Sequence, residues 1–283
     1  MKTAFLFAGQ GAQTPGMGKD IYEADPLAKA VFDSVELDVD IKDLCFQGPK
    51  EKLDDTQYAQ PAIFVTSMAL AKVLHEYGIQ ADVVAGLSLG EYAALTASGK
   101  ISVEDAIRVI DKRGQYMQEA VPSGGAMAAV LGLDVETIEK ICADTRGIVE
   151  IANDNCPGQT VISGEAEAVY LAGEAMKGAG AKRVAVLNVS GPFHSSMLKR
   201  AGERLAPELE RVCWLDSDIP YVSNTTAELI RDKGMIAPLL VRQISESVRW
   251  QQDMKVMMDM GVEIFVEIGP GKTLAGFAKR INR

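Results

Sequence analysis

The sequence predicts an α/β protein built around a parallel sheet with helices on both faces. Short apolar runs that have the length of buried strands alternate with longer helical segments, which is the order of repeated β-α units. The 283 residues are enough for one large domain that carries a smaller insert. Hydrophobic residues make up 47% and charged residues 24% of the chain, as in an ordinary folded soluble protein.

The first elements of this core can be placed along the chain. Lys2–Phe7 is a short apolar run that ends in the glycine turn 9–11, so we expect a buried strand. We expect a helix from Pro61 to Tyr77, because proline suits the first turn of a helix and Gly78 ends this segment. Val83–Leu87 is a second expected buried strand.

Two expected helices continue the alternation. The first covers Glu91–Ser98 and ends at Gly99. The second covers Val103–Ala120, where Ser102 and Asp105 approach the spacing of a capping box.

The middle of the chain has a different order of elements. The expected order is βαββαβ, the split βαβ pattern of a ferredoxin-like unit, formed by Ala126–Gly132, Val135–Asp144, Ile148–Ala152, Thr160–Ser163, Ala166–Lys177 and Arg183–Val189. Glycine- and proline-containing segments at 124–125 and 190–192 mark the expected hinges. We therefore expect a ferredoxin-like subdomain over 124–190, inserted into a core formed by 1–123 and 191–283. Strand character returns at Tyr221–Ser223 and Ile264–Glu267.

Composition excludes several functions. A formal charge of −10 argues against nonspecific binding to nucleic acid or to an anionic membrane. The first apolar run is too short for a secretory signal, and no later run has the length of a membrane span. Four scattered cysteines and two histidines predict reduced thiols, no metal site and a cytoplasmic protein.

Ser88 is the candidate nucleophile. Residues 86–90 read G-L-S-L-G, which fits G-x-S-x-G, and they lie between an expected strand and an expected helix. In such an elbow the serine hydroxyl is exposed above the sheet, and the N–H of the next residue lies at a helix N-terminus, where it can stabilise an oxyanion. The alternative is a chance turn bounded by glycines. The N–H of Gln10, in the turn after the first strand, could be a second oxyanion donor, although a plain turn explains that loop equally well.

A serine nucleophile needs a base, and only two histidines are available. His75 falls on the polar side of its expected helix, so we expect it to be solvated. His194 lies in the loop Ser190–Ser195, directly after an expected strand, where catalytic side chains concentrate; the alternative is a histidine that caps the next helix. By elimination His194 is the expected base. No nearby acid stands out to orient it.

Arg113 is the candidate for binding a substrate carboxylate. On the helix from Val103 it lies at the border of the apolar side, while Arg108 and Lys112 point to the opposite, solvated side. A border arginine often only lays its stem along the core. Its alternative role is to hold a carboxylate through two parallel hydrogen bonds.

Eight short motifs together are specific for one family. In chain order they are FAGQGAQ (Phe7–Gln13), QPA (Gln60–Ala62), GLSLGEY (Gly86–Tyr92), DKRGQYMQ (Asp111–Gln118), NDNCPGQTVISG (Asn153–Gly164), GPFHSSM (Gly191–Met197), SNTTA (Ser223–Ala227) and EIGPGK (Glu267–Lys272). The sequence thereby resembles the malonyl-CoA:acyl-carrier-protein transacylases and the acyltransferase domains of fatty-acid and polyketide synthases. Many members have histidine before the nucleophile, where this chain has Leu87; some bacterial members also have leucine.

The resemblance implies a fold and a site. The fold is an α/β-hydrolase-like core with a ferredoxin-like insert. The implied site has these parts: nucleophile Ser88, base His194, oxyanion donors at the N–H groups of Gln10 and Leu89, Arg113 for the malonyl carboxylate, the backbone carbonyl of Gln243 to orient the histidine, and Phe193 for malonyl specificity. Malonyl-CoA and the phosphopantetheinylated acyl carrier protein of fatty-acid or polyketide synthesis are the implied partners. No cofactor is implied, and a monomer is expected.

Two other functions remain open from the residues alone. A thioesterase or carboxylic ester hydrolase can use the same elbow, and an inactive module could only dock carrier proteins. Carrier proteins are usually acidic, so docking on this acidic chain needs a local basic patch. Lys182, Arg183, Lys199 and Arg200 flank the His194 loop and are candidates for it, although a solvated surface also explains them.

Overall fold

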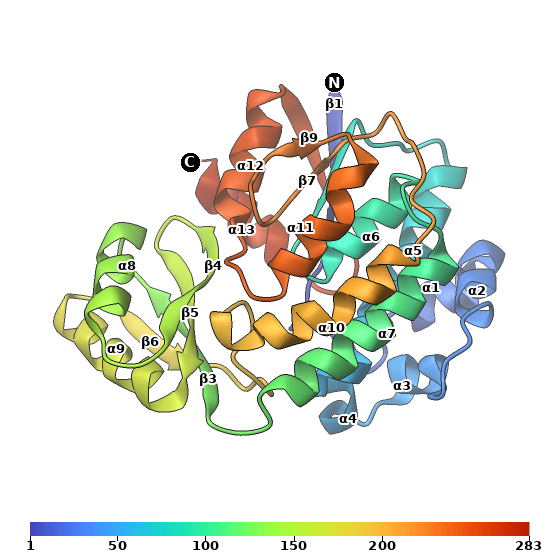
Figure 1. The fold of residues 1–283 in the computed structure, drawn as a ribbon. Helices are drawn as coiled ribbons and strands as arrows, with labels where there is room; N and C mark the ends of the chain where they lie inside the picture. Colours follow the sequence, from blue (N-terminus) through green and yellow to red (C-terminus); the bar gives the residue numbers. More distant parts are fainter. Residues whose placement is uncertain (283) are drawn as a thin grey trace.

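A five-stranded sheet lies at the centre of the larger part of the molecule in the computed structural model, which describes residues 1–282 (Figure 1). The strand order is β8-β7-β2-β1-β9, with bounds Lys2–Phe7 (β1), Val83–Gly86 (β2), Tyr221–Val222 (β7), Leu229–Ile230 (β8) and Val262–Ile268 (β9). Strands β9, β1, β2 and β7 pair in parallel, and only the edge strand β8 is antiparallel. The predicted mixed α/β architecture with a parallel sheet is confirmed.

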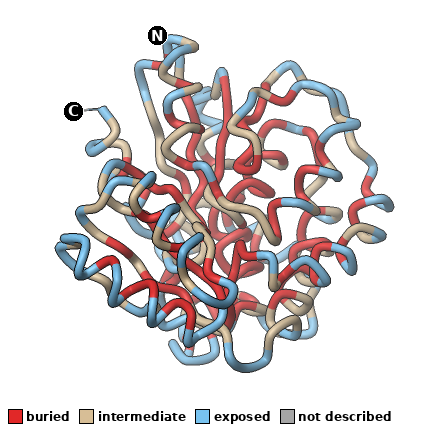
Figure 2. Tube along the Cα trace, turned by 60° about the vertical axis from the view of Figure 1, so that its left-hand side comes forward, coloured by how far each residue is buried: buried red, intermediate tan, exposed pale blue. Residues whose placement is uncertain are grey.

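Both faces of this sheet are buried, which explains why β1 reads as a continuous apolar run. Phe5 and Phe7 belong to a large hydrophobic cluster on one face, whereas Ala4 and Leu6 belong to a second cluster on the other face. This alternation follows from the two-residue period of a strand. Figure 2 shows the buried backbone concentrated in the interior, with exposed segments around it.

Helices cover both faces. They are Lys19–Ala24 (α1), Pro26–Asp33 (α2), Ile41–Gln47 (α3), Lys50–Asp54 (α4), Thr56–Glu76 (α5), Gly90–Ala97 (α6), Val103–Ala120 (α7), Lys199–Glu210 (α10), Ile236–Gln243 (α11), Trp250–Asp259 (α12) and Thr273–Ile281 (α13), with short 3₁₀ turns at Ser196–Leu198 and Lys233–Met235. Residues of α5, α7 and α10 join the first cluster, and residues of α12 and α13 join the second. None of the helices within residues 1–282 combines the length and the apolar character that a membrane span requires.

Helix α5 begins at Thr56, so the predicted start at Pro61 is wrong. Pro61 lies in the second turn rather than the first, and there it removes one intrahelical hydrogen bond. The preceding turn is retained because Thr56, Ala59 and Gln60 are buried in the protein interior. Gln60 thereby enters the functional site described below.

The central segment folds into a separate four-stranded sheet. Its elements are Gly125–Leu131 (β3), Val135–Asp144 (α8), Val149–Cys156 (β4), Gln159–Glu165 (β5), Ala166–Gly178 (α9) and Arg183–Val186 (β6). The sheet order is β4-β5-β3-β6, and all neighbouring strands are antiparallel. A third hydrophobic cluster, formed by residues of these strands and helices, gives this segment its own core. In Figure 1 it lies to the left of the larger sheet.

The turn between β2 and α6 requires glycine on both sides of Ser88. A Cβ atom at Gly86 would collide with the backbone of Gly90, and one at Gly90 would collide with the carbonyl oxygen of Phe7. Ser88 itself has φ of 54°, a left-handed conformation that costs free energy in a residue other than glycine. The tight turn therefore presents the serine at the carboxyl end of the parallel sheet.

Candidate active site

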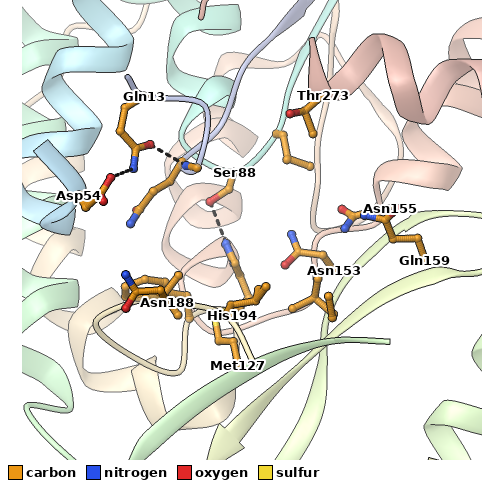
Figure 3. A pocket seen from close by; sticks show the side chains of 18 of the residues that line it. Gln13, Asp54, Ser88, Met127, Asn153, Asn155, Gln159, Asn188, His194 and Thr273 are labelled. Atoms are coloured by element: carbon orange, nitrogen blue, oxygen red, sulfur yellow. Dashed lines mark hydrogen bonds between the residues drawn. The ribbon is translucent and has the colours of Figure 1, made fainter. Parts of the chain in front are cut away.

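Ser88 opens into a cavity of about 450 Å³ between the two sheets. The larger part contributes Gln10, Leu87 and His194 to its wall. Met127, Asn153 and Gln159 from strands β3, β4 and β5 line the opposite side, as Figure 3 shows. A substrate that reaches Ser88 thus contacts both parts of the molecule.

His194 lies beside the serine hydroxyl. Its Nε2 is 2.8 Å from Ser88 Oγ, and its Nδ1 is 2.8 Å from the backbone carbonyl oxygen of Gln243 (Figure 3 for the first contact). A carbonyl can only accept, so Nδ1 carries the proton and Nε2 accepts from the serine hydroxyl. This geometry suits proton transfer from the serine, with a carbonyl in place of an acid as the group that orients the imidazole.

The imidazole is held in its neutral, basic form. His194 is 5% exposed, and burial lowers its pKa to about 4, with the nearby Arg113 cation as the next cause. At pH 7 the ring is therefore unprotonated and can accept a proton. Its backbone, like that of Ser88, is left-handed, with φ of 57°. Strained residues of this kind concentrate at functional sites.

Arg113 is fully enclosed, so the border position predicted for it is wrong. Its guanidinium donates to Gln60 Oε1, to Gln243 Oε1 at 3.0 Å and to Ser88 Oγ at 3.0 Å, and it lies 5.5 Å from the centre of the Tyr92 ring. The side chain is buried because α5 and α6 cover that side of α7. Arg108 points to the other side and pairs with Asp105 and Glu208, as predicted for a solvated arginine.

No carboxylate of residues 1–282 forms an ion pair with Arg113. Its hydrogen-bond acceptors are two neutral amides and one hydroxyl, and its Nε atom is buried without a partner. The buried Glu91 favours the cation from a distance, but no carboxylate contacts it directly. Burial of such a cation is costly, and an incoming carboxylate would relieve that cost. The arrangement is therefore suited to an anionic acyl group next to Ser88.

Two backbone N–H groups beside the serine have no acceptor among the described residues. Within residues 1–282 neither the N–H of Gln10 nor that of Leu89 donates to a protein acceptor. Leu89 immediately precedes α6, where the helix dipole favours negative charge. Gly9 brings the Gln10 loop against the elbow, because a Cβ atom there would collide with the carbonyl oxygen of Leu87. Both groups are placed where they can stabilise an oxyanion.

Phe193 lies at the cavity, whereas His75 does not. Phe193 is 6% exposed and lines the cavity together with Met117 and Leu187, which makes that wall apolar. His75 is exposed near the end of α5, away from the cavity lining. Residues 1–282 contain no group of three or more histidine, cysteine or acidic side chains with metal-binding geometry, and their four cysteines are unpaired.

Four residues around the elbow were not assigned a role from sequence. Gln60 accepts from Arg113, and Asn224 accepts from the backbone N–H of Ser88 at 2.7 Å. Glu91 and Asp253 are fully buried acids that accept from the amides of Gln243 and Asn224. Gln60, Glu91 and Asn224 lie within the motifs QPA, GLSLGEY and SNTTA, but a motif alone does not show which atoms its side chains contact.

The chain is similar over nearly its whole length to proteins of one family. A family model described as acyl transferase domain matches residues 4–280. A malonyl CoA-acyl carrier protein transacylase of Bacillus subtilis (strain 168) is 46% identical over 288 aligned residues, which cover 100% of this chain and 91% of the relative. The protein of the same name from Escherichia coli O157:H7 is 43% identical, with 98% of this chain and 92% of the relative covered.

Solved structures of similar proteins share the fold. A malonyl CoA-acyl carrier protein transacylase from Clostridium perfringens superposes with a TM-score of 0.96 at 44% identity, covering 100% of this chain and 90% of that one. The structure of MCAT from Streptococcus pneumoniae has a TM-score of 0.95 at 49% identity, covering 99% and 93%. A malonyl-transacylase in complex with a type II PKS acyl-carrier protein has a TM-score of 0.96 at 41% identity, covering 99% and 93%.

Proposed function

The chain belongs to the family of acyl transferase domains, and we propose that it transfers a malonyl group from coenzyme A to the phosphopantetheine thiol of acyl carrier protein. The relatives named malonyl CoA-acyl carrier protein transacylase match it over its whole length. The observation that carries the proposal is Arg113, a buried cation that no carboxylate of residues 1–282 contacts in an ion pair and that lies 3.0 Å from the hydroxyl of Ser88. The malonyl carboxylate would be the anion in direct contact with this guanidinium.

The first half-reaction makes a malonyl-serine. The Ser88 Oγ–H proton passes to His194 Nε2 while Oγ forms a bond to the thioester carbonyl carbon. The carbonyl oxygen becomes an oxyanion that accepts from the N–H groups of Gln10 and Leu89. When the tetrahedral intermediate collapses, the C–S bond breaks and the coenzyme A sulfur takes the proton from His194.

The second half-reaction is the same chemistry with the other thiol. The phosphopantetheine thiol of the carrier protein gives its proton to His194 and attacks the malonyl-serine carbonyl. Collapse breaks the Oγ–C bond, and Ser88 recovers the proton from His194. Each oxyanion donor contributes roughly 3 kcal/mol to lowering the barrier. Thioester exchange is nearly balanced in free energy, so no cofactor is required.

We propose that Arg113 and Phe193 contact the acyl group of the substrate. Arg113 binds the malonyl carboxylate and thereby favours malonyl over uncharged acyl groups. Phe193 lies in the cavity wall beside the nucleophile and limits the room next to the acyl α-carbon. The carbonyl of Gln243 holds the imidazole in the tautomer that the reaction needs.

Ester or thioester hydrolysis is the competing function, because water can replace the second thiol on the same scaffold. Incubation of the protein with malonyl-CoA, with and without phosphopantetheinylated carrier protein, separates the two. A transferase loads the carrier and releases little free malonate, whereas a hydrolase releases malonate at the same rate with or without the carrier. A carrier that remains unloaded would contradict the proposal.

We also propose that the chain consists of an α/β-hydrolase-like core with a ferredoxin-like subdomain and that the protein is cytoplasmic. The order βαββαβ and the sheet order β4-β5-β3-β6 support a ferredoxin-like subdomain at 124–190. The elbow after a parallel strand supports an α/β-hydrolase-like core at 1–123 and 191–283. Four unpaired cysteines support a cytoplasmic location.

A further inference from the structure

The backbone of Ser88 is held by the side chains of two amide residues. Its N–H donates to Asn224 Oδ1 at 2.7 Å, and its carbonyl oxygen accepts from Gln243 Nε2 at 2.9 Å. Asn224 and Gln243 are 0% and 1% exposed, so water does not compete for these bonds. We propose that these two side chains, here called the amide clamp, are positioning residues that hold the nucleophile in its reactive conformation.

The orientation of each amide is determined by its neighbours. The nitrogen of Asn224 donates to the carbonyl oxygen of Gly86 at 2.8 Å, and a carbonyl cannot donate, so the amide oxygen must face the N–H of Ser88. In Gln243 the oxygen accepts from Arg113 at 3.0 Å, and an arginine cannot accept, so the nitrogen must face the carbonyl of Ser88. A flipped amide would lose its partners on both sides.

Two buried acids hold the clamp from behind. Asp253 Oδ2 accepts from Asn224 Nδ2 at 2.8 Å, and Glu91 Oε2 accepts from Gln243 Nε2 at 2.6 Å. Both acids are fully buried. The amides are therefore fixed at both ends, and their freedom to follow a relaxing Ser88 backbone is small.

The clamp acts on the reaction through peptide planarity. The carbonyl of Ser88 and the N–H of Leu89 belong to one trans peptide unit and point in opposite directions. By holding the carbonyl, Gln243 fixes the direction of the N–H that is proposed to stabilise the oxyanion. By holding the N–H of Ser88, Asn224 fixes the preceding peptide plane and opposes relaxation from φ of 54°.

This inference rests on the proposed acyl transfer at Ser88, and the test separates the two. The rate of Ser88 malonylation by malonyl-CoA is measured by rapid quench and intact-protein mass spectrometry on folded protein. For Asn224→Ala we expect the maximal rate to fall about 100-fold, the size of effect that a small misplacement of reacting groups produces. The malonyl-CoA concentration at half-maximal rate should change little, because Asn224 does not line the cavity.

Thr225→Val is the matched control. Thr225 is the next residue, is buried, and donates to the carbonyl of Leu239. Its substitution removes a buried hydrogen bond from the same loop without touching Ser88. A merely structural role of Asn224 would make both variants less stable and leave the maximal rate of each folded variant near wild type.

Gln243→Met supplies a second, independent variant, because it keeps the backbone carbonyl for His194 and removes only the amide. Its acylation is followed with 4-nitrophenyl acetate, which has no carboxylate for Arg113 to bind, and a loss similar to that of Asn224→Ala is expected. If every folded clamp variant acylates Ser88 at the wild-type rate, the clamp is refuted while the transferase stands. If the wild type itself is not acylated at Ser88, the proposed function fails first.

Discussion

A guanidinium nitrogen of Arg113 lies 3.0 Å from the hydroxyl of Ser88 inside the protein, and the acceptors around that cation are all neutral. Burial lowers the pKa of the guanidinium, since the charge is removed from water. A substrate carboxylate that reaches this position restores the lost electrostatic stabilisation. The contact between Arg113 and Ser88 therefore connects the nucleophile with selectivity for an acyl group that carries a carboxylate.

Removal of this cation should separate malonyl from acetyl transfer. Arg113→Ala is expected to lower kcat/KM for malonyl-CoA by about 2–3 kcal/mol, roughly 30- to 150-fold, the scale for a lost charged hydrogen bond. The effect with acetyl-CoA should be much smaller. Arg108→Ala, on the same helix but in partly buried ion pairs on its other side, is the control and should affect neither substrate. Equal losses with both substrates would assign Arg113 a structural role.

The pH dependence should follow the buried histidine. Because the pKa of His194 is lowered to about 4 from its ordinary 6.5, acylation of Ser88 should persist through pH 5–6 and be lost only as the pH falls through about 4. The rate falls at low pH because His194 acts as a base, and a protonated imidazole cannot accept the serine proton. The measurement is kcat/KM against pH, with irreversible acid unfolding checked in parallel.

Arg113→Ala provides a test of the cause of this shift. The arginine cation disfavours a second positive charge on His194, so its removal should raise the apparent pKa of the acid limb. Burial is the larger cause, and the pKa should therefore stay below 6.5. A wild-type acid limb near 6.5 would show that the imidazole is more hydrated than the structure places it.

Phe193 should limit the size of the acyl group. Phe193→Ser removes a ring from the cavity wall and makes room for a methyl group on the acyl α-carbon. The rate ratio of methylmalonyl-CoA to malonyl-CoA should rise roughly 10-fold, the lower end of what one methyl group is worth in a pocket. Single-turnover labelling of Ser88 with each thioester measures the ratio. An unchanged ratio would place the specificity elsewhere.

Carrier docking should depend on the basic residues after the His194 loop. Lys199 and Arg200 are both exposed at the start of α10. The double variant Lys199→Glu/Arg200→Glu should raise the KM for the carrier protein, more so at low salt, and leave malonylation by malonyl-CoA unchanged. Lys140→Glu, an exposed lysine on α8, is the control. Carrier kinetics that do not move would locate the docking surface elsewhere.

The sequence predicts best those helices whose first turn is marked by a capping residue. The bounds of α7 and α8 agree with the sequence because Ser102 and Asp134 cap their first turns. The four short helices between residues 19 and 54 were not predicted, since each is only five to eight residues long, too short a window for an apolar pattern to identify a helix. Strand β4 runs on to Cys156, beyond the predicted end at Ala152, and its polar residues Asn153 and Asn155 line the cavity.

Local pattern likewise identifies some residues of the site and not others. Ser88 is identifiable from its strand, turn and helix, and His194 from elimination between two histidines. Their partners are not identifiable from such reasoning. A backbone carbonyl, such as that of Gln243, has no residue-type signal, and only the family resemblance indicated its role. Asn224 and Asp253 reach the elbow from distant segments, and their contacts depend on how the sheet assembles.

The most direct test of acylation at Ser88 is intact-protein mass spectrometry after incubation with malonyl-CoA. The wild type should gain the mass of one malonyl group, His194→Ala should gain it far more slowly, and Ser88→Ala should gain none. Peptide mapping should place the group on Ser88. A Ser88→Ala protein that is malonylated as fast as the wild type, or a folded wild type that is never labelled, would contradict the proposed mechanism.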